Sequence, residues 1–590
     1  MEPGHSVAEV KSAEVGVPRA SSVLSAVLSA TILLGGILTI ALMLYLVVSS
    51  YSSQPYNDQW TILVFAAKGG DLLSPAWLWE RYAEHRLPIP KLFLAADLYC
   101  FRDNQKFLLG SIFVFQFLHL VLLSWSMRRL GGWRGALWLT GTGLAAFCLF
   151  YLSQWESFIF GFCVNFVLAQ LLATSSFVAL LLYWNQLQRH PERPSPKFLL
   201  LSIFATVACT YCLASGNLLW PILVGAALYL RLPRRAILTL AGAAAVSTAV
   251  YFFHYLRPGA HSRPVFSNLG APLHMLRFCA EYLFGTWAHH GVYFAVLIVF
   301  CELAIATIVI FLTLSYLRSF RAFGIQLLLM MTFWLATAAV TAAGRLNSIS
   351  AGQSRYQTVI LLLWCCGGLL LLGCTFFARS RFRHGFLFAQ AIVLLVFIAG
   401  AIALPYSISQ VRRHQFRLDT AAASLITRVY DPQELDWVSW GPAAHDDLLK
   451  AVSYLRNNRL SVFAGDRPAM LGQRLQAVYP NISFSDCGGA VESMVLIRGP
   501  DGPGLRLTGW AWDTTRRRPA SSIIVATEQS IRGFGAVGGW HAGVRDASPS
   551  VPGSYMGYVA YVPLPPPGSV ISVYAVLPAR KPTVCFIGSK

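Results

Sequence analysis

The sequence predicts an α-helical polytopic membrane protein with about eleven transmembrane helices, followed by an extracytoplasmic α+β region that ends in a β-sandwich or jelly-roll. Two observations from composition support this class: 56% of the 590 residues are hydrophobic and only 12% are charged. Soluble domains carry about 25% charged residues, so a soluble globule of this composition could not cover its surface. The high apolar content also excludes a disordered chain. The third observation is a change to short strand-like segments after residue 406.

Residues 1–22 are polar, and we expect a disordered cytoplasmic N-terminus there. The apolar run Val23–Val48 is longer than the roughly 7–15 residues of a signal-peptide core and long enough to span a bilayer. It therefore predicts an uncleaved first helix. Further apolar runs of similar character lie at 107–126, 135–152, 158–184, 198–214, 217–230, 236–253, 291–315, 325–343, 359–377 and 386–406.

The connecting loops alternate in charge along the chain. Short basic loops carry Arg128, Arg129, Arg134, Arg189, Arg193, Lys197, Arg231, Arg234, Arg235, Arg318, Arg321, Arg379, Arg381 and Arg383. The positive-inside rule places these loops in the cytoplasm. The sequence thus predicts a multi-pass protein of the inner (plasma) membrane, with its N-terminus cytoplasmic and its C-terminal region extracytoplasmic. The long loop 51–106 then faces outward.

Within this topology, residues 23–406 form the transmembrane domain, and the outward chain continues to residue 590. Residues 407–499 are expected to form a helical linker region. Residues 500–590 contain strand-like segments separated by Gly/Pro-rich breaks, which predict the β-sandwich. Cys487 and Cys585 lie in this polar part and would be able to pair outside the cytoplasm; the sequence leaves their pairing open.

Acidic residues are scarce between Val23 and Pro405, and six of the ten lie in the loop 51–106. Asp58 follows closely on the first helix, so it lies near the outer interface. A carboxylate there is able to deprotonate an acceptor hydroxyl or to bind a divalent cation, Mg²⁺ or Mn²⁺. It is equally able to cap a short helix as an interfacial residue.

Two outward arginines, Arg345 and Arg355, bracket a Gly/Ser-rich loop on the side that the positive-inside rule leaves poor in charge. Such a pair can clamp a phosphate or diphosphate by bidentate hydrogen bonds. Each can also simply reach toward lipid phosphate. The chain has no Lys/Arg stripe of the kind that binds nucleic acid, and it has no P-loop, Rossmann fingerprint or GxSxG motif.

Four short motifs carry a resemblance to a known superfamily. Asn57–Trp60 reads NDQW, Glu84–Arg86 reads EHR, Gln154–Glu156 reads QWE and Ser354–Tyr356 reads SRY. Over residues 23–406 the chain resembles the GT-C polytopic glycosyltransferases, among them protein mannosyltransferases and the lipid A glycosyl- and aminoarabinose transferases. One departure is that Gln59 stands where many members carry a second acid.

The resemblance implies transfer of a sugar from a polyprenyl-phosphate or polyprenyl-diphosphate donor in the bilayer to a glycan, lipid or protein acceptor. It implies a catalytic set with Asp58 as general base, assisted by Glu84 and His85. The donor phosphate would contact Arg345, Arg355 and Tyr356. The remaining substrate-binding residues would be Asn57, Gln59, Trp60, Arg86, Gln154, Trp155 and Glu156.

Rival functions remain open at this point. A lipid-linked glycan transporter or flippase would also need many helices and outward charges, although the sequence shows no inverted repeat and its acids lie in a loop. A glycan polymerase or ligase would share the chemistry. A non-catalytic scaffold would use only the β-domain, to bind glycan.

Overall fold

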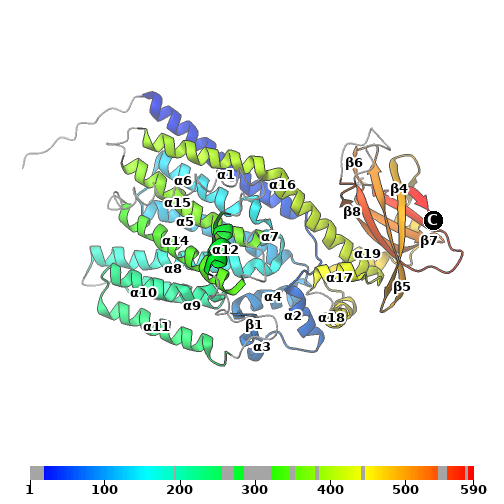
Figure 1. The fold of residues 1–590 in the computed structure, drawn as a ribbon, viewed down its shortest axis with the longest axis horizontal. Helices are drawn as coiled ribbons and strands as arrows, with labels where there is room; N and C mark the ends of the chain where they lie inside the picture. The colour runs from blue at the N-terminus through cyan, green and yellow to red at the C-terminus, as the bar shows by residue number, and fades with distance from the viewer. Residues whose placement is uncertain are drawn as a thin grey trace, which may run out of the picture.

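The computed structural model describes residues 19–191, 195–255, 272–284, 320–345, 353–378, 384–439, 445–541, 555–577 and 583–590. Long, roughly parallel and antiparallel helices form one bundle (Figure 1). Their bounds are α1 Arg19–Ser49, α5 Lys106–Arg129, α6 Gly135–Phe150, α8 Val164–Arg189, α9 Lys197–Thr210, α10 Leu219–Tyr229, α11 Arg234–Phe252, α12 Pro272–Phe284, α14 Arg321–Arg345, α15 Gln357–Phe377 and α16 Gly385–Thr427.

The bundle is that of a multi-pass membrane protein. Among the described residues, 8 helical segments are long and apolar enough to cross a membrane, and two shorter apolar helices, Lys197–Thr210 and Ala214–Tyr229, accompany them. The apolar runs expected from the sequence are helical over most of their length wherever they are described. The expected run 291–315 and residues 1–18 lie outside the described residues.

Small side chains let the first helix approach its neighbours closely. A Cβ on Gly36 of α1 would lie 2.6 Å from the carbonyl oxygen of Gly143 in α6, so only glycine fits at this crossing. Beside it, Gln390 of α16 donates to Ser29 at 2.8 Å, and Thr140 of α6 donates to Ser29 at 3.0 Å. These buried bonds connect three helices inside the bundle. The polar side chains satisfy one another there because water does not reach them.

The loop 51–106 is ordered and packs at one end of the bundle (Figure 1). It forms α2 Gln59–Ala67, α3 Pro75–Trp79, the β1 Arg81–Tyr82 and β2 His85–Arg86 hairpin, and α4 Pro88–Phe101. Buried Lys91 donates to the carbonyl of Glu80 at 2.7 Å and to that of Trp77. Burial lowers the pKa of Lys91 to about 8. The loop is therefore fixed by internal polar contacts as well as by its apolar side chains.

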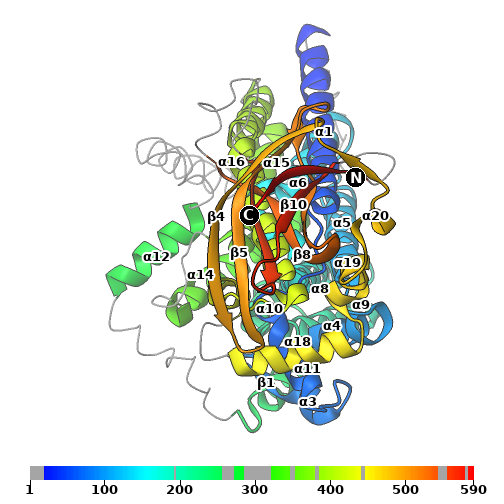
Figure 2. The ribbon, with the colours of Figure 1, turned by 90° about the vertical axis from the view of Figure 1, so that its right-hand side faces the viewer.

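The last apolar run does not end near residue 406 as expected. Instead the helix that contains this run, α16, is 43 residues long in all, with Pro405 inside it, and it ends where Arg428 adopts a left-handed conformation (φ 61°). It leads to short helices and the sheet, which lie together at the same end as the first loop (Figures 1 and 2). These helices are α17 Pro432–Val438, α18 His445–Asn457, α19 Asp466–Met470 and α20 Leu475–Val478.

The C-terminal strands form one nine-stranded sheet in the order β3-β11-β10-β7-β8-β9-β5-β4, with β6 paired to β5. The sheet begins at Asn481, earlier than residue 500. Its bounds are β3 Asn481–Ser483, β4 Cys487–Gly499, β5 Gly502–Asp513, β6 Arg518–Pro519, β7 Ser522–Thr527, β8 Ser530–Gly539, β9 Gly557–Pro563, β10 Ile571–Leu577 and β11 Thr583–Ser589.

The sheet curls into a half-barrel, so a single sheet encloses the core that two sheets of a sandwich would enclose. Strands β4 and β11 stand near opposite ends of the strand order, yet a Cβ on Gly489 of β4 would lie 2.7 Å from Ile587 of β11. The disulfide between Cys487 and Cys585 joins the same two strands. The pairing that the sequence left open is therefore made, and it fixes the curled shape.

Candidate functional site

Two of the four motifs, QWE and SRY, meet directly although they are about 200 residues apart. The Ser354 hydroxyl accepts a hydrogen bond from the Glu156 amide at 3.1 Å and donates to the Ser153 carbonyl at 2.7 Å. The Arg355 amide donates to Glu156 Oε2 at 3.3 Å, and the Arg355 Nη1 lies 4.0 Å from Glu156 Oε1. The side chains of Arg355 and Glu156 are only 12% and 13% exposed, so this ion pair is largely shielded from water.

Asp58 stands at the N-terminus of α2, where the sequence allowed a capping role. Its side chain makes no capping hydrogen bond. Instead, Asp58 Oδ1 accepts a hydrogen bond from the Tyr82 hydroxyl at 2.6 Å. The preceding residue, Asn57, adopts φ 52°, which asparagine tolerates better than most residues. The carboxylate of Asp58 is thus directed toward the β1–β2 hairpin and away from its own helix.

Tyr56 joins these two groups electrostatically. Its pKa is raised to about 12, first by burial and next by the negative charge of Glu156. The charges of Arg355, Arg417 and Asp58 act on the same hydroxyl. Charges from the NDQW, QWE and SRY segments and from α16 therefore act on one phenol, which keeps its proton at neutral pH.

The hairpin brings the EHR motif to the same region. Tyr82, which donates to Asp58, is the cross-strand partner of His85, so their side chains lie on one face of the hairpin. His85 Nδ1 accepts a hydrogen bond from the Ala214 amide at 3.2 Å, which assigns the proton to Nε2. That Nε2 lies 3.4 Å from Glu84 Oε1. Glu84 and His85 thus form a polar pair next to the Tyr82–Asp58 contact.

Arg86 has a different environment from the one expected of a substrate-binding residue. Its buried guanidinium donates to the carbonyl of Tyr251 at 2.6 Å, to that of Trp79 at 2.6 Å and to that of Phe253. Burial lowers the pKa of Arg86. These bonds attach the hairpin to the end of α11, so the contacts of Arg86 position the loop.

Several other predicted residues also support the site from below. Buried Gln154 donates to the Cys148 carbonyl at 2.9 Å, Gln59 accepts from the Tyr56 amide at 3.0 Å, and Trp60 is a buried residue of α2. Tyr356 packs its ring 5.3 Å from Tyr282 of α12. Their proposed contacts with substrate remain predictions.

One predicted residue cannot be compared, and several site residues were not anticipated. Arg345 ends α14, but its side chain lies outside the described residues. Sequence reasoning missed Tyr82 and an aromatic cluster in which the His414 ring lies 4.8 Å from Tyr56, 5.2 Å from Trp155 and 5.2 Å from Trp437. A signal was present: the segment VRRHQFR lies just beyond the last apolar run, on the side expected to lack positive charge.

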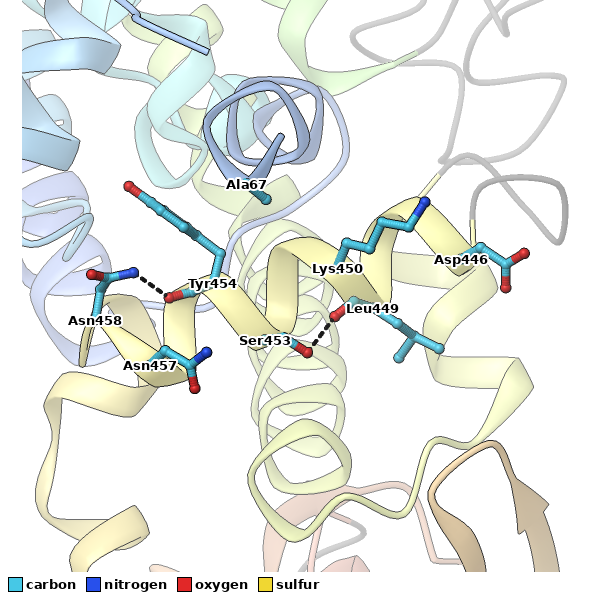
Figure 3. A pocket seen from close by; sticks show the side chains of 8 residues that line it. All are labelled: Ala67, Asp446, Leu449, Lys450, Ser453, Tyr454, Asn457 and Asn458. Carbon is cyan, nitrogen blue, oxygen red and sulfur yellow. Dashed lines mark hydrogen bonds between the residues drawn. The ribbon is translucent and has the colours of Figure 1, made fainter. Parts of the chain in front are cut away.

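A groove on the described surface lies elsewhere. An open groove of about 660 Å³ lies along α18 beside the end of α2 (Figure 3). It is lined by Ala67, Asp446, Leu449, Lys450, Ser453, Tyr454, Asn457 and Asn458. We place the candidate site at Asp58 because the paired charges and the motifs are there. Across the described ranges, no three His, Cys, Asp or Glu side chains gather into a group that could hold a metal ion.

Comparisons with known proteins give little further identification. No family model matches the chain, and no curated protein matches it. One similar solved structure is the crystal structure of ArnT from Cupriavidus metallidurans bound to undecaprenyl phosphate. The two share 16% sequence identity with a TM-score of 0.32, over 76% of this chain and 82% of that one. At these values the likeness carries no argument about activity.

Proposed function

We propose that the chain is a GT-C-type glycosyltransferase that moves a hexosyl or pentosyl group from a polyprenyl-phosphate or polyprenyl-diphosphate donor to an acceptor hydroxyl on a lipid, glycan or protein. The observation that carries the proposal is the direct contact of Glu156 with Arg355, whose charges act with that of Asp58 on the Tyr56 hydroxyl, from three motifs that resemble this superfamily. We place the site on the extracytoplasmic face, as the basic loops indicate.

In the proposed reaction, Asp58 accepts the proton of the acceptor hydroxyl while that oxygen attacks the anomeric carbon. The bond between the anomeric carbon and the phosphate oxygen breaks, and the phosphate leaves with the electron pair. The sugar is therefore inverted at the anomeric carbon. Arg355 stabilises the charge that develops on the leaving phosphate.

The surrounding contacts fit these roles. The Tyr82 hydroxyl holds the Asp58 carboxylate at 2.6 Å, and Glu156 orients Arg355 from 4.0 Å without neutralising it through a close ion pair. Glu84 and His85 are placed to orient the acceptor.

The test is transfer by the purified chain in lipid nanodiscs, with undecaprenyl phosphate carrying a tritiated hexose or pentose as donor. We expect Asp58→Asn to lower the rate by about 10²–10⁴-fold, which is the usual contribution of a general base. The matched control is Asp71→Asn, since Asp71 is an exposed acid of the same loop whose carboxylate, among the described residues, accepts only from the Leu73 amide. Transfer by Asp58→Asn at the wild-type rate would exclude the base assignment. Movement of intact donor across the bilayer without cleavage would favour a flippase.

A further inference from the structure

We infer that Arg417 binds the phosphate of the lipid-linked donor together with Arg355; this inference rests on the proposed function and names a residue that the sequence motifs do not contain. The Arg417 guanidinium carbon lies 4.3 Å from the centre of the Trp437 ring. The Trp437 ring in turn lies 5.0 Å from the ring of Tyr56. Stacking on Trp437 thus holds the Arg417 guanidinium beside the candidate site.

The position of Arg417 along α16 suits a lipid phosphate. Gln415 of α16 donates to the carbonyl of Ser49, the last residue of α1, at 3.4 Å. Arg417 therefore lies about half a turn beyond the end of the first membrane-spanning helix. The headgroup of a lipid donor would lie at this level, with its apolar tail among the helices.

The second argument is that the donor groups of Arg417 are not used by the protein. Arg355 donates through Nε to Gln353 at 2.9 Å and faces Glu156, and Arg86 donates to three carbonyls. Within the described part of the chain, Arg417 makes neither a hydrogen bond nor an ion pair, although it is half-buried. A guanidinium that is held by its face leaves its in-plane N–H groups directed outward, as bidentate phosphate binding requires.

The charges around Arg417 fit an anion that is held between two cations. Glu434, Tyr56 and Arg413 are the groups whose charges act on Arg417. Arg355 and Arg417 both act on the Tyr56 hydroxyl. That hydroxyl has no hydrogen-bond partner among the described residues, so it can donate to a phosphate oxygen between the two arginines.

The alternative is that Arg417 only joins α16 to α17 through Trp437. The experiment compares Arg417→Gln and Arg417→Lys with Arg412→Gln, since Arg412 is an exposed arginine of the same helix. The affinity for undecaprenyl phosphate and for phosphatidylglycerol is measured in nanodiscs, together with the thermal midpoint and the donor KM.

We expect Arg417→Gln to weaken binding of undecaprenyl phosphate about tenfold or more, as loss of a charge-assisted contact predicts, and to raise the donor KM. Arg417→Lys should lose less, and Arg412→Gln should stay within twofold of wild type. A lower thermal midpoint with unchanged affinity would overturn the inference and show that Arg417 only joins α16 to α17. An equal loss of affinity for phosphatidylglycerol and for undecaprenyl phosphate would also overturn the inference. It would show that Arg417 contacts the headgroups of bilayer lipids in general. If the protein binds undecaprenyl phosphate in a way that depends on Arg417 but transfers no sugar, the inference is supported and the proposed function is refuted.

Discussion

The same three residue types, Asp, Tyr and Arg, meet in two places at the end of the bundle where the loop 51–106 and the sheet lie. Where α17 meets the sheet, Asp431 accepts from Arg506 at 3.0 Å, from the Tyr561 hydroxyl at 2.9 Å and from the Gln433 amide at 3.0 Å. At the candidate site, Asp58 accepts from Tyr82 at 2.6 Å, while the arginine of that site lies 4.0 Å from a different acid, Glu156.

The difference distinguishes a structural joint, the contacts around Asp431, from a candidate binding site, the contacts around Asp58 and Arg355. The Asp431 carboxylate is 1% exposed and both of its oxygens are used by the protein, so it has nothing left to offer a ligand. At the site, the acid and the arginine belong to different pairs, and the ion pair is long. Because Arg355 is shielded from water but only loosely paired with Glu156, it can respond to charge that appears on a substrate.

The largest effect on stability is expected at the structural joint around Asp431, and it would test this comparison. Asp431→Asn should destabilise the protein by about 2–3 kcal/mol, which is near the lower end for broken buried ion pairs because Arg506 is 23% exposed. The thermal midpoint in detergent measures this loss, with exposed Asp486→Asn as control. Transfer per folded molecule should remain, whereas Asp58→Asn should lose transfer and keep its midpoint. An Asp431→Asn variant that is stable and inactive would contradict the division.

A smaller effect is expected at Glu434, which lies between the two regions. Burial and the charge of Asp431 raise its pKa to about 7, against the opposing charges of Arg417 and Arg506. Because the folded protein binds this proton more tightly than the unfolded chain does, the contribution of Glu434 to stability should be fully present below pH 4.5 and should be lost as the pH rises through 7.

Glu434→Gln should remove that fall. We expect the variant to exceed wild type by about 1–2 kcal/mol at pH 8 and to equal it at pH 4, discounting the full shift for partial exposure. Thermal midpoints across this pH range measure the difference. A variant that is less stable than wild type at pH 8 would show that the Glu434 carboxylate is a favourable partner of Arg417.

The smallest effect is expected at Tyr82. Tyr82→Phe removes the 2.6 Å hydrogen bond to Asp58 and keeps the ring packed 5.5 Å from Phe162. The rate of transfer should fall by about tenfold or less, as loss of one hydrogen bond to a carboxylate predicts, and its pH profile should shift because Asp58 loses a donor to its ionised form. An unchanged pH profile would make Tyr82 a packing residue only.

The membrane-spanning helices were predictable because their signal is local. Runs such as 325–343 and 359–377 are apolar over the thickness of a bilayer, and they appear as α14 and α15 with ends shifted by a few residues. The end of α16 was not predictable in this way. Hydropathy falls after residue 406, but the helix continues because its further turns pack on strands β8 and β9.

The candidate site was predictable only in part, for a related reason. NDQW, QWE and SRY could be singled out because acids and outward arginines are rare in this chain. Tyr82 and Trp437 have ordinary local contexts. His414 and Arg417 lie in the basic segment VRRHQFR, whose charge was a signal, but the role of all four residues depends on the docking of the hairpin, α16 and α17 against α2. Conversely, Arg86 stood out by its motif, yet its contacts are with carbonyls that only the folded end of α11 supplies.

The continuity of α16 has a mechanical consequence. A helix of 43 residues is about 65 Å long, which exceeds the thickness of a bilayer, and its last turns pack on the curled sheet. The sheet therefore cannot change its height above the lipid without a tilt or a bend of that helix, and Pro405 is the residue where a bend costs least. Under the proposed function, a substrate that touched both the sheet and the Asp58 site would therefore be held at a separation that the length of α16 sets.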